Sequence, residues 1–260
     1  MRVAMALACV LSVLAAASAG EPAAPLAPPA PLRVCLVSAS AEYKSDASLA
    51  DFQMFLEPKY NASCSRVFGA DKGDTLPGLE AIDSCDVMVL FTRRVKLPAE
   101  QLARVKKYFQ AGRPVVGLRT ASHAFQNYLE FDKEVLGGNY NGHYGVGPVT
   151  QVSIVEKVKD HPILAGVKPF TSPASLYKNT GAAADIELLL TGTILDPKEQ
   201  KEITHPLAWT RIHNGGRVFY TSLGSPDDFA KENFRRMLVN AVFWAAKRPV
   251  EPRPSDVPPK

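Results

Sequence analysis

The sequence lacks several patterns that would point directly to a function. It has no GxGxxG or P-loop pattern, so a tightly held nucleotide is not expected, and no CxxC or HExxH spacing that would indicate a zinc site. The formal net charge of +4 is spread along the chain without a basic block, which argues against nucleic-acid binding. After residue 19 no apolar run approaches the ~20 residues needed to cross a bilayer, so we expect no membrane anchor.

The first 19 residues have the pattern of a secretory signal peptide. Arg2 precedes an apolar run, and Ala17, Ser18 and Ala19 form a small-residue cleavage site. We therefore expect export, either to the periplasm or out of the cell. Residues 20–31 are rich in Pro and Ala and predict an extended linker, residues 32–248 predict one globular domain, and residues 249–260 form a Pro-rich tail.

Cysteine is scarce, because only Cys35, Cys64 and Cys85 follow the predicted cleavage site. An oxidising compartment permits one disulfide and leaves one free thiol. Cys64 opens a predicted strand and Cys85 immediately precedes another, so both could lie at the same end of a sheet. We predict a Cys64–Cys85 bond; the alternative is three buried, reduced thiols that act as small apolar residues.

Strands and helices alternate in the first half of the globular region. Short apolar runs predict four strands, at residues 33–38, 64–68, 87–91 and 115–118. Apolar residues at helical spacing predict three helices, at residues 49–60, 99–111 and 124–129. This alternation is typical of an α/β fold with a parallel sheet covered on both faces.

The second half is less regular but still contains strand and helix patterns. Alternating or apolar runs predict strands at residues 149–155, 188–191, 208–212 and 217–223. Residues 234–244 have a strong apolar stripe at helical spacing, and we expect this helix to close the domain.

The segment from Gly117 to His123 lies where the fourth strand gives way to a predicted helix, a place where open α/β sheets bind ligands. Its apex is Arg119, which cannot act as a nucleophile. The adjacent residues Ser122 and His123 would not face one another on a helix, so they predict no Ser–His pair. Arg119, Thr120 and Ser122 instead suit a polar or anionic ligand and are candidates for substrate binding, whereas the alternative makes Thr120 or Ser122 a helix cap and Arg119 a surface ion-pair partner.

Other polar residues should converge on the same edge, because they follow parallel strands. These candidates for substrate binding are Tyr43, Arg93 and, after the last strand, Asp228, which could equally cap the closing helix. A Gly-rich loop at residues 137–145 adds amides and aromatic rings, which suit a carbohydrate. In this loop Asn141 and Tyr144 are candidates for substrate binding and His143 is a candidate for catalysis. The alternative is that the loop is only a surface turn.

The five histidines divide into two groups. His161 and His205 both precede Pro and predict loops, and His213 predicts a hairpin turn. His123 and His143 remain as candidates for acid/base catalysis. Two ligands are too few for a metal site, so we expect no cofactor, although a divalent metal such as zinc would be held if a carboxylate or water joined them.

These motifs together resemble the ThuA-like (trehalose utilisation) family over nearly all of the globular region. The resemblance rests on residues 117–123, Gly142-His143, 161–166, 205–209 and 217–224. It implies a single flavodoxin-like, class I glutamine amidotransferase-like three-layer α/β domain with a mostly parallel central sheet. It also places Arg119 at the position of the amidotransferase cysteine, so glutamine hydrolysis should be absent.

The resemblance implies a role in the uptake and breakdown of trehalose and related disaccharides, partly through 3-keto sugars. We therefore expect a lyase, isomerase or hydrolase of oxidised glycosides, with His123 or His143 as acid/base and with Arg119 and Arg93 holding polarised oxygens. The alternatives are a sugar-binding module without catalysis and a partner-binding domain. The expected partner is a small carbohydrate, and a homo-oligomer is not excluded.

Overall fold

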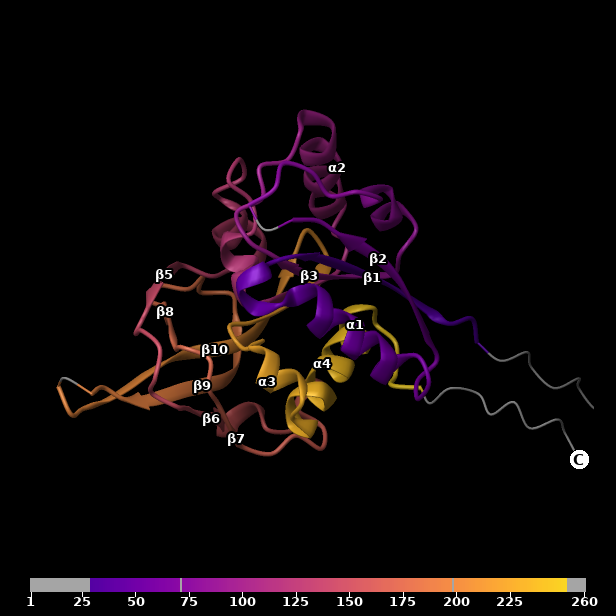
Figure 1. Ribbon diagram of the computed structural model, residues 1–260. Helices are drawn as coiled ribbons and strands as arrows, with labels where there is room; N and C mark the ends of the chain where they lie inside the picture. Colours follow the sequence, from indigo (N-terminus) through magenta and orange to yellow (C-terminus); the bar gives the residue numbers. More distant parts are fainter. Residues whose placement is uncertain (1–28, 71, 198, 252–260) are drawn as a thin grey trace, which may run out of the picture.

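The computed structural model describes residues 29–70, 72–197 and 199–251. The predicted signal peptide, most of the linker and most of the tail lie outside these residues. The described chain is built around a nine-stranded sheet with helices on both faces, in the strand order β2-β1-β3-β4-β11-β10-β9-β6-β7 (Figure 1). No helix within the described ranges is long and apolar enough to span a bilayer.

One half of the sheet is parallel, as the sequence predicts. Its strands are β2 (Ala62–Phe68), β1 (Leu32–Ala39), β3 (Val87–Thr92), β4 (Val115–Leu118) and β11 (Gly216–Thr221). Strands β3 and β4 are buried along their whole length, which explains their uninterrupted apolar sequences. Parallel pairing brings the residues that follow β1, β3, β4 and β11 to one edge of the sheet.

The other half of the sheet is antiparallel, so the sheet as a whole is mixed. Its strands are β10 (Glu202–His213), β9 (Glu187–Leu195), β6 (Thr150–Ile154) and β7 (Phe170–Ser172). Strands β10 and β6 run against the other seven. A separate two-stranded sheet joins β5 (Tyr140–His143) to β8 (Tyr177–Asn179).

The loop predicted at His205-Pro206 is wrong, because both residues lie within β10. The pairing of β10 with β9 shifts register immediately after Pro206, and such an irregularity accommodates a residue that has no N–H to donate. The loop predicted at His161-Pro162 is a short 3₁₀ turn, Pro162–Leu164, which His161 caps by accepting the Ile163 N–H. The predicted turn at His213 is confirmed at the end of β10.

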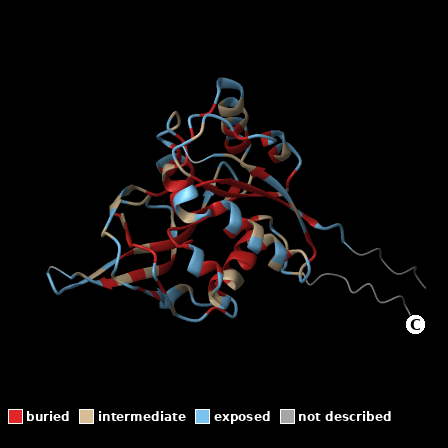
Figure 2. Cartoon of the chain, in the orientation of Figure 1, coloured by how far each residue is buried: buried red, intermediate tan, exposed pale blue. Residues whose placement is uncertain are grey.

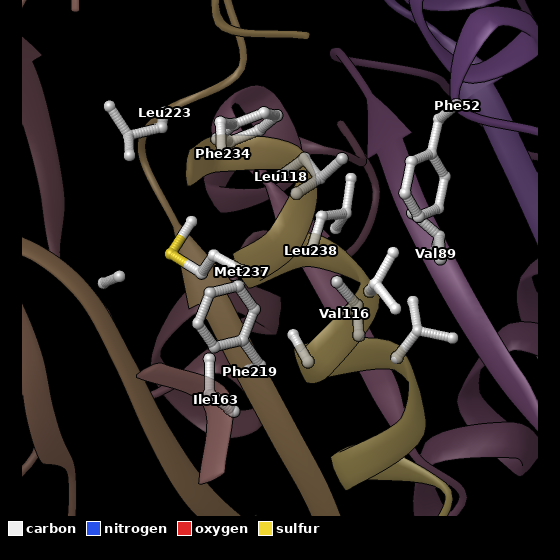
Figure 3. Close-up of a cluster of buried hydrophobic side chains, with 14 of the residues drawn as sticks. Phe52, Val89, Val116, Leu118, Ile163, Phe219, Leu223, Phe234, Met237 and Leu238 are labelled. Atoms are coloured by element: carbon white, nitrogen blue, oxygen red, sulfur yellow. The ribbon is translucent and has the colours of Figure 1, made fainter. Parts of the chain in front are cut away.

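Helices cover the two faces of the sheet and bury a core on each side (Figure 2). On one side lie α1 (Ser45–Leu56), α4 (Glu232–Ala245) and the short α3 (Pro226–Phe229), and on the other lies α2 (Ala99–Gln110). Figure 3 shows how Phe234, Met237 and Leu238 of α4 pack toward Val116 and Phe219 of the sheet. The three layers agree with the predicted fold class.

The helix predicted at residues 124–129 does not form. A 3₁₀ turn, Arg119–His123, follows β4, and a π-helical turn, Asp132–Leu136, comes later. Residues 124–126 instead pair with Val95 in the segment after β3. The Val95 N–H donates to the Ala124 carbonyl, and the Gln126 N–H donates to the Val95 carbonyl. These hydrogen bonds occupy backbone groups of residues 124–126 that are therefore not available to a helix. The side chain of Leu129, expected on the buried face of that helix, is 76% exposed.

The predicted Cys64–Cys85 disulfide is also wrong, because Cys35, Cys64 and Cys85 are all free. Cys64 packs against the core on the α1 and α4 side of the sheet, whereas Cys85 belongs to the core on the α2 side. Two thiols on opposite faces of a sheet cannot bond without backbone movement. The alternative reading, buried thiols that pack as apolar residues, describes Cys35 and Cys85.

Replacement of Leu238 by Ala tests the packing of α4. This side chain is 0% exposed, so we expect the free energy of unfolding to fall by about 2–5 kcal/mol, measured by urea denaturation. The matched control is Leu195→Ala in β9, where the side chain is 55% exposed and a change within about 0.5 kcal/mol is expected. Equal effects of the two substitutions would contradict the described core.

Candidate functional site

A pocket of ≈ 460 Å³ opens beyond the carboxyl ends of β3 and β4. Arg94 follows β3 in its wall, Ser122 and His123 follow β4, and Asn139 and Tyr140 lead into β5. The remaining wall comes from residues 124–133. This is the edge at which the sequence predicted a ligand site, and ligands of open α/β sheets bind at such edges.

Arg119 lies at the apex of the turn after β4, with a backbone φ of 43° in the left-handed region. Its side chain points into the protein and is buried, with 1% of the residue exposed. Nη2 donates to the Ser175 hydroxyl at 2.9 Å and to the Ser175 carbonyl at 3.2 Å, and Nη1 donates to the Ser222 carbonyl. The guanidinium carbon lies 4.5 Å from the ring centre of Tyr43 and 4.4 Å from that of Tyr177.

These contacts assign Arg119 a structural role that neither sequence interpretation predicted. Arg119 does not line the pocket, so it is not placed to hold a substrate oxygen, and it is too buried to be a surface ion-pair partner. Its backbone carbonyl accepts hydrogen bonds from the Tyr220 hydroxyl at 2.8 Å and from the Ser122 hydroxyl at 3.3 Å. The turn is therefore held from both the side chain and the main chain.

Ser122 and His123 form the side-chain pair that the sequence argued against. Ser122 Oγ lies 3.1 Å from His123 Nδ1, because the chain makes a 3₁₀ turn here instead of the expected α-helix. The Ser122 hydroxyl has one proton, so it donates either to the Arg119 carbonyl at 3.3 Å or to Nδ1 at 3.1 Å. In the tautomer in which the hydroxyl donates to Arg119, Nδ1 carries the imidazole proton and Nε2 is able to accept a proton or a hydrogen bond.

The imidazole of His123 is neutral at neutral pH. Its pKa is lowered to about 3, first by burial and then by the positive charges of Arg94, Arg93 and Arg119. The ring stacks on Tyr140, with centres 4.6 Å apart and planes inclined by 19°. His123 thus combines a fixed orientation, a place in the pocket wall and a strongly positive electrostatic environment.

Asp132 is a second titratable residue in the pocket wall, and the sequence analysis missed it. Burial raises its pKa to about 6. Its Oδ2 accepts the backbone N–H of Tyr140 at 2.8 Å, which fixes the strand that carries the ring stacked on His123. Pairs of titratable groups with pKa values shifted in opposite directions are typical of functional sites.

His143 lies in the same aromatic cluster as His123 but not in the pocket wall. The rings of His123 and His143 lie 6.3 and 6.5 Å from that of Tyr177. His143 is exposed on β5, and its Nδ1 accepts the Gly145 N–H at 3.0 Å. Of the two predicted catalytic histidines, only His123 is therefore positioned in the pocket.

The other candidates in the Gly-rich loop lie apart from the pocket wall. Asn141 is exposed on β5. The Tyr144 hydroxyl lies 2.8 Å from His205 Nε2, and Lys178 Nζ lies 4.6 Å from the centre of the Tyr144 ring. These residues border the aromatic cluster through β5 and β8, but they do not line the cavity.

The remaining predicted ligands hold the framework together. Arg93 Nε forms an ion pair of 2.9 Å with Glu42, and Thr120 is buried, where its hydroxyl donates to Ser40 at 3.2 Å. The Asp228 carboxylate accepts the N–H groups of two residues and the hydroxyl of a third, each at 3.0 Å; these are Gly224, Ser225 and Ser172. Asp228 is wholly buried and completes a capping box on the short helix α3 with the N-cap residue Ser225, whereas the alternative interpretation placed it at the start of the closing helix, where the N-cap is Lys231.

Four residues that shape this site were not among the selected candidates: Arg94, which follows the third predicted strand, Tyr140 of the Gly-rich loop, Asp132 and Tyr177. Tyr140 lay within the Gly-rich loop and could have been chosen by its aromatic character. Tyr177 carried no signal, because β8 reaches the site only through its pairing with β5. Within residues 29–70, 72–197 and 199–251, no group of three or more His, Cys, Asp or Glu side chains is arranged to hold a metal ion.

Comparison with known proteins places this geometry in context. A family model named ThuA and described as trehalose utilisation matches residues 33–245. No curated protein matches the chain. Two solved structures described as putative thua-like proteins superpose on it. The one from Parabacteroides merdae has a TM-score of 0.64 and 19% sequence identity, and the match covers 88% of this chain and 95% of that one. The one from Bacteroides uniformis has a TM-score of 0.62 and 18% identity, and the match covers 87% of this chain and 95% of that one.

A β-galactosidase from a Rahnella species also superposes, with a TM-score of 0.53 and 14% identity. The match covers 85% of this chain but 32% of that one, so it concerns one part of a larger protein. At identities this low, the three structures show a shared fold and do not assign an activity.

Protonation of His123 should destabilise the fold in mild acid. Its folded pKa of about 3 lies below the ordinary value of 6.5, so the unfolded chain binds the proton more tightly and stability falls as pH drops below 6.5. Between pH 7 and 5 the wild type should lose up to about 2 kcal/mol more than His123→Gln, measured by urea denaturation at each pH. If both proteins lost the same free energy of unfolding between pH 7 and 5, the pKa of His123 in the folded protein would not be lowered.

Arg119→Lys should destabilise the protein by about 2–3 kcal/mol, because an ammonium cannot reproduce the fork that meets Ser175 and Ser222 or the contact with two rings. Thermal and urea unfolding would measure the loss. The control Arg236→Lys alters an exposed pair with Glu232 and should change stability by less than about 0.5 kcal/mol. A tolerated Arg119→Lys would mean that the buried guanidinium is dispensable.

Proposed function

The chain belongs to the ThuA (trehalose utilisation) family, and on this basis we propose that it is an exported protein that binds and processes a disaccharide or its 3-keto derivative in the pocket beside His123. The observation that carries the proposal is the placement of a neutral, oriented imidazole in the wall of a ≈ 460 Å³ pocket with a cation at its rim. Export is inferred from the composition of residues 1–19.

The pocket has features that suit a sugar. Its volume falls in the range of small-molecule sites, and its wall includes the rings of Phe125, Tyr128 and Tyr140. Aromatic rings can cover the apolar faces of a sugar ring, while the Asn139 amide and His123 Nε2 can meet its hydroxyl groups.

The same groups can act on an oxidised sugar. In a 3-keto glycoside the C2–H bond lies beside the carbonyl, so Nε2 of His123 can accept that proton while the bonding electrons move to the carbonyl oxygen. The enolate can then expel the group at C1, which leaves with the C1–O electrons and takes a proton from the imidazolium or from water. The overall result is an elimination that consumes no other reagent.

Positive charge favours the developing enolate. Arg94 is exposed in the wall of the pocket, and its charge lowers the pKa of His123. Its backbone φ of 51° is unusual for a residue other than glycine. The field that lowers the pKa of His123 also stabilises an oxyanion in the same space.

A second candidate is a sugar-binding module without catalysis. The observation that favours it is the pKa of about 3 for His123, since a base this weak removes a proton from carbon slowly. Under this alternative Nε2 only accepts a hydrogen bond from a sugar hydroxyl. Glutamine amidotransfer is not a candidate, because the buried Arg119 stands at the apex of the turn.

Turnover of a 4-nitrophenyl 3-keto-glucoside distinguishes the candidates. Elimination releases nitrophenol, and we expect His123→Gln to lower kcat by about 100-fold or more because it removes the proton acceptor. Apparent affinity should change by less than tenfold, since the pocket wall is otherwise intact.

The control is His213→Gln, which alters a histidine at the hairpin end of β10 and should leave turnover unchanged. Binding of the sugar without release of nitrophenol by the wild type would favour the binding module. If no disaccharide or keto sugar binds at millimolar concentration, both candidates are wrong.

A further inference from the structure

A second cavity, of ≈ 600 Å³, lies at the opposite edge of the parallel strands. Its wall includes Arg33, the second residue of β1, Arg113, which precedes β4, and Arg217, the second residue of β11. Lys247 and Arg248 follow the end of α4. None of these residues takes part in the pocket beside His123.

The lining of this second cavity carries an excess of positive charge. It includes five basic side chains and a single acidic one, Asp86. Asp86 forms an ion pair of 2.6 Å with Arg33, and Arg248 pairs at 2.7 Å with Glu251, which lies outside the lining. The other three cations, Arg113, Arg217 and Lys247, form no ion pair with a carboxylate in the described part of the chain.

The two unpaired arginines are held in fixed orientations by neutral groups. Arg113 donates to the carbonyls of Ile82 and Cys85, and its guanidinium carbon lies 4.5 Å from the centre of the Tyr108 ring. Arg217 donates to the Trp244 carbonyl at 2.8 Å and lies 4.8 Å from the centre of the Trp244 ring.

Carbonyls and rings orient a guanidinium without neutralising it. The carbonyl contacts use one N–H of Arg217 and two of Arg113, and the remaining N–H groups and the Lys247 ammonium are available to a ligand. Because the two arginines are already oriented, a ligand pays little conformational entropy for their contacts. Two partly buried guanidinium groups without counter-charge make the cavity favourable for an anion.

The thiol of Cys85 lies beside Arg113 in the cavity wall. Its pKa is lowered to about 7, first by a hydrogen bond with Cys35 and also by the charge of Arg113, although burial acts in the opposite direction. Arg113 Nη2 lies 3.8 Å from the Cys85 sulfur.

We propose that this cavity is a binding site for a small polyvalent oxyanion with the chemistry of a diphosphate. Guanidinium groups match phosphate oxygens in geometry, and the three cations without a carboxylate partner all line this cavity, so a ligand with two anionic groups can use more of them than one with a single charge. The site is separate from the sugar pocket, so the two can be tested independently.

Calorimetric titration of the full-length mature protein with pyrophosphate tests the proposal. We expect saturable binding that weakens as salt rises and that is at least tenfold tighter than binding of inorganic phosphate. Lys247→Gln should weaken pyrophosphate binding by about tenfold, since Lys247 is exposed and its loss should not affect folding. Arg113→Gln should weaken it further, with circular dichroism used to check that this variant folds.

The matched control is Arg236→Gln, which removes an exposed positive charge from α4 outside the cavity and should leave the affinity unchanged. Absence of saturable binding, equal affinity for phosphate and pyrophosphate, or equal weakening by Lys247→Gln and Arg236→Gln would each overturn the proposal. His123→Gln should bind pyrophosphate normally, so failure of the sugar hypothesis would not affect this result.

Discussion

The guanidinium of Arg119 joins parts of the chain that are far apart in sequence. It contacts Tyr43 after β1, Ser175 and Tyr177 beside β8, and the carbonyl that follows β11, while its own backbone belongs to the turn after β4. A buried cation is costly unless its donors are satisfied and its charge is spread over polarisable rings. The contacts of Nη1, Nη2 and the two rings supply most of this compensation, although Nε has no hydrogen-bond partner among the described residues, and they hold the turn that carries Ser122 and His123.

The electrostatics of the pocket follow from this arrangement. Burial keeps His123 neutral in the first place, and the charges of Arg94, Arg93 and the buried Arg119 lower its pKa further. In the tautomer that carries its proton on Nδ1, next to Ser122, the neutral imidazole has a free lone pair on Nε2. The same environment that makes His123 a weak base in the empty pocket makes an oxyanion more stable there, so basicity and oxyanion stabilisation cannot be adjusted separately.

Much of the fold could be predicted from local patterns, whereas the site depended on tertiary contacts. The limits of β4 match the prediction because a fully buried strand has an unbroken apolar sequence, and α2 begins where Pro98 permits it. Residues 124–129 have helical spacing, but Val95 takes their backbone hydrogen bonds. Likewise, no sequence spacing reveals that Cys64 and Cys85 lie on opposite faces, or that Tyr177 reaches Arg119.

The buried side chain at the apex also limits which residues position 119 can carry. Replacement of Arg119 by Cys would place a small thiol at the turn after β4. It would also remove the side chain that fills the space beside Tyr43 and Tyr177 and would leave the Ser175 and Ser222 carbonyls without their donor. A change of side chain at this apex therefore carries a cost in stability as well as a change in chemistry, and neighbouring substitutions would have to compensate for it.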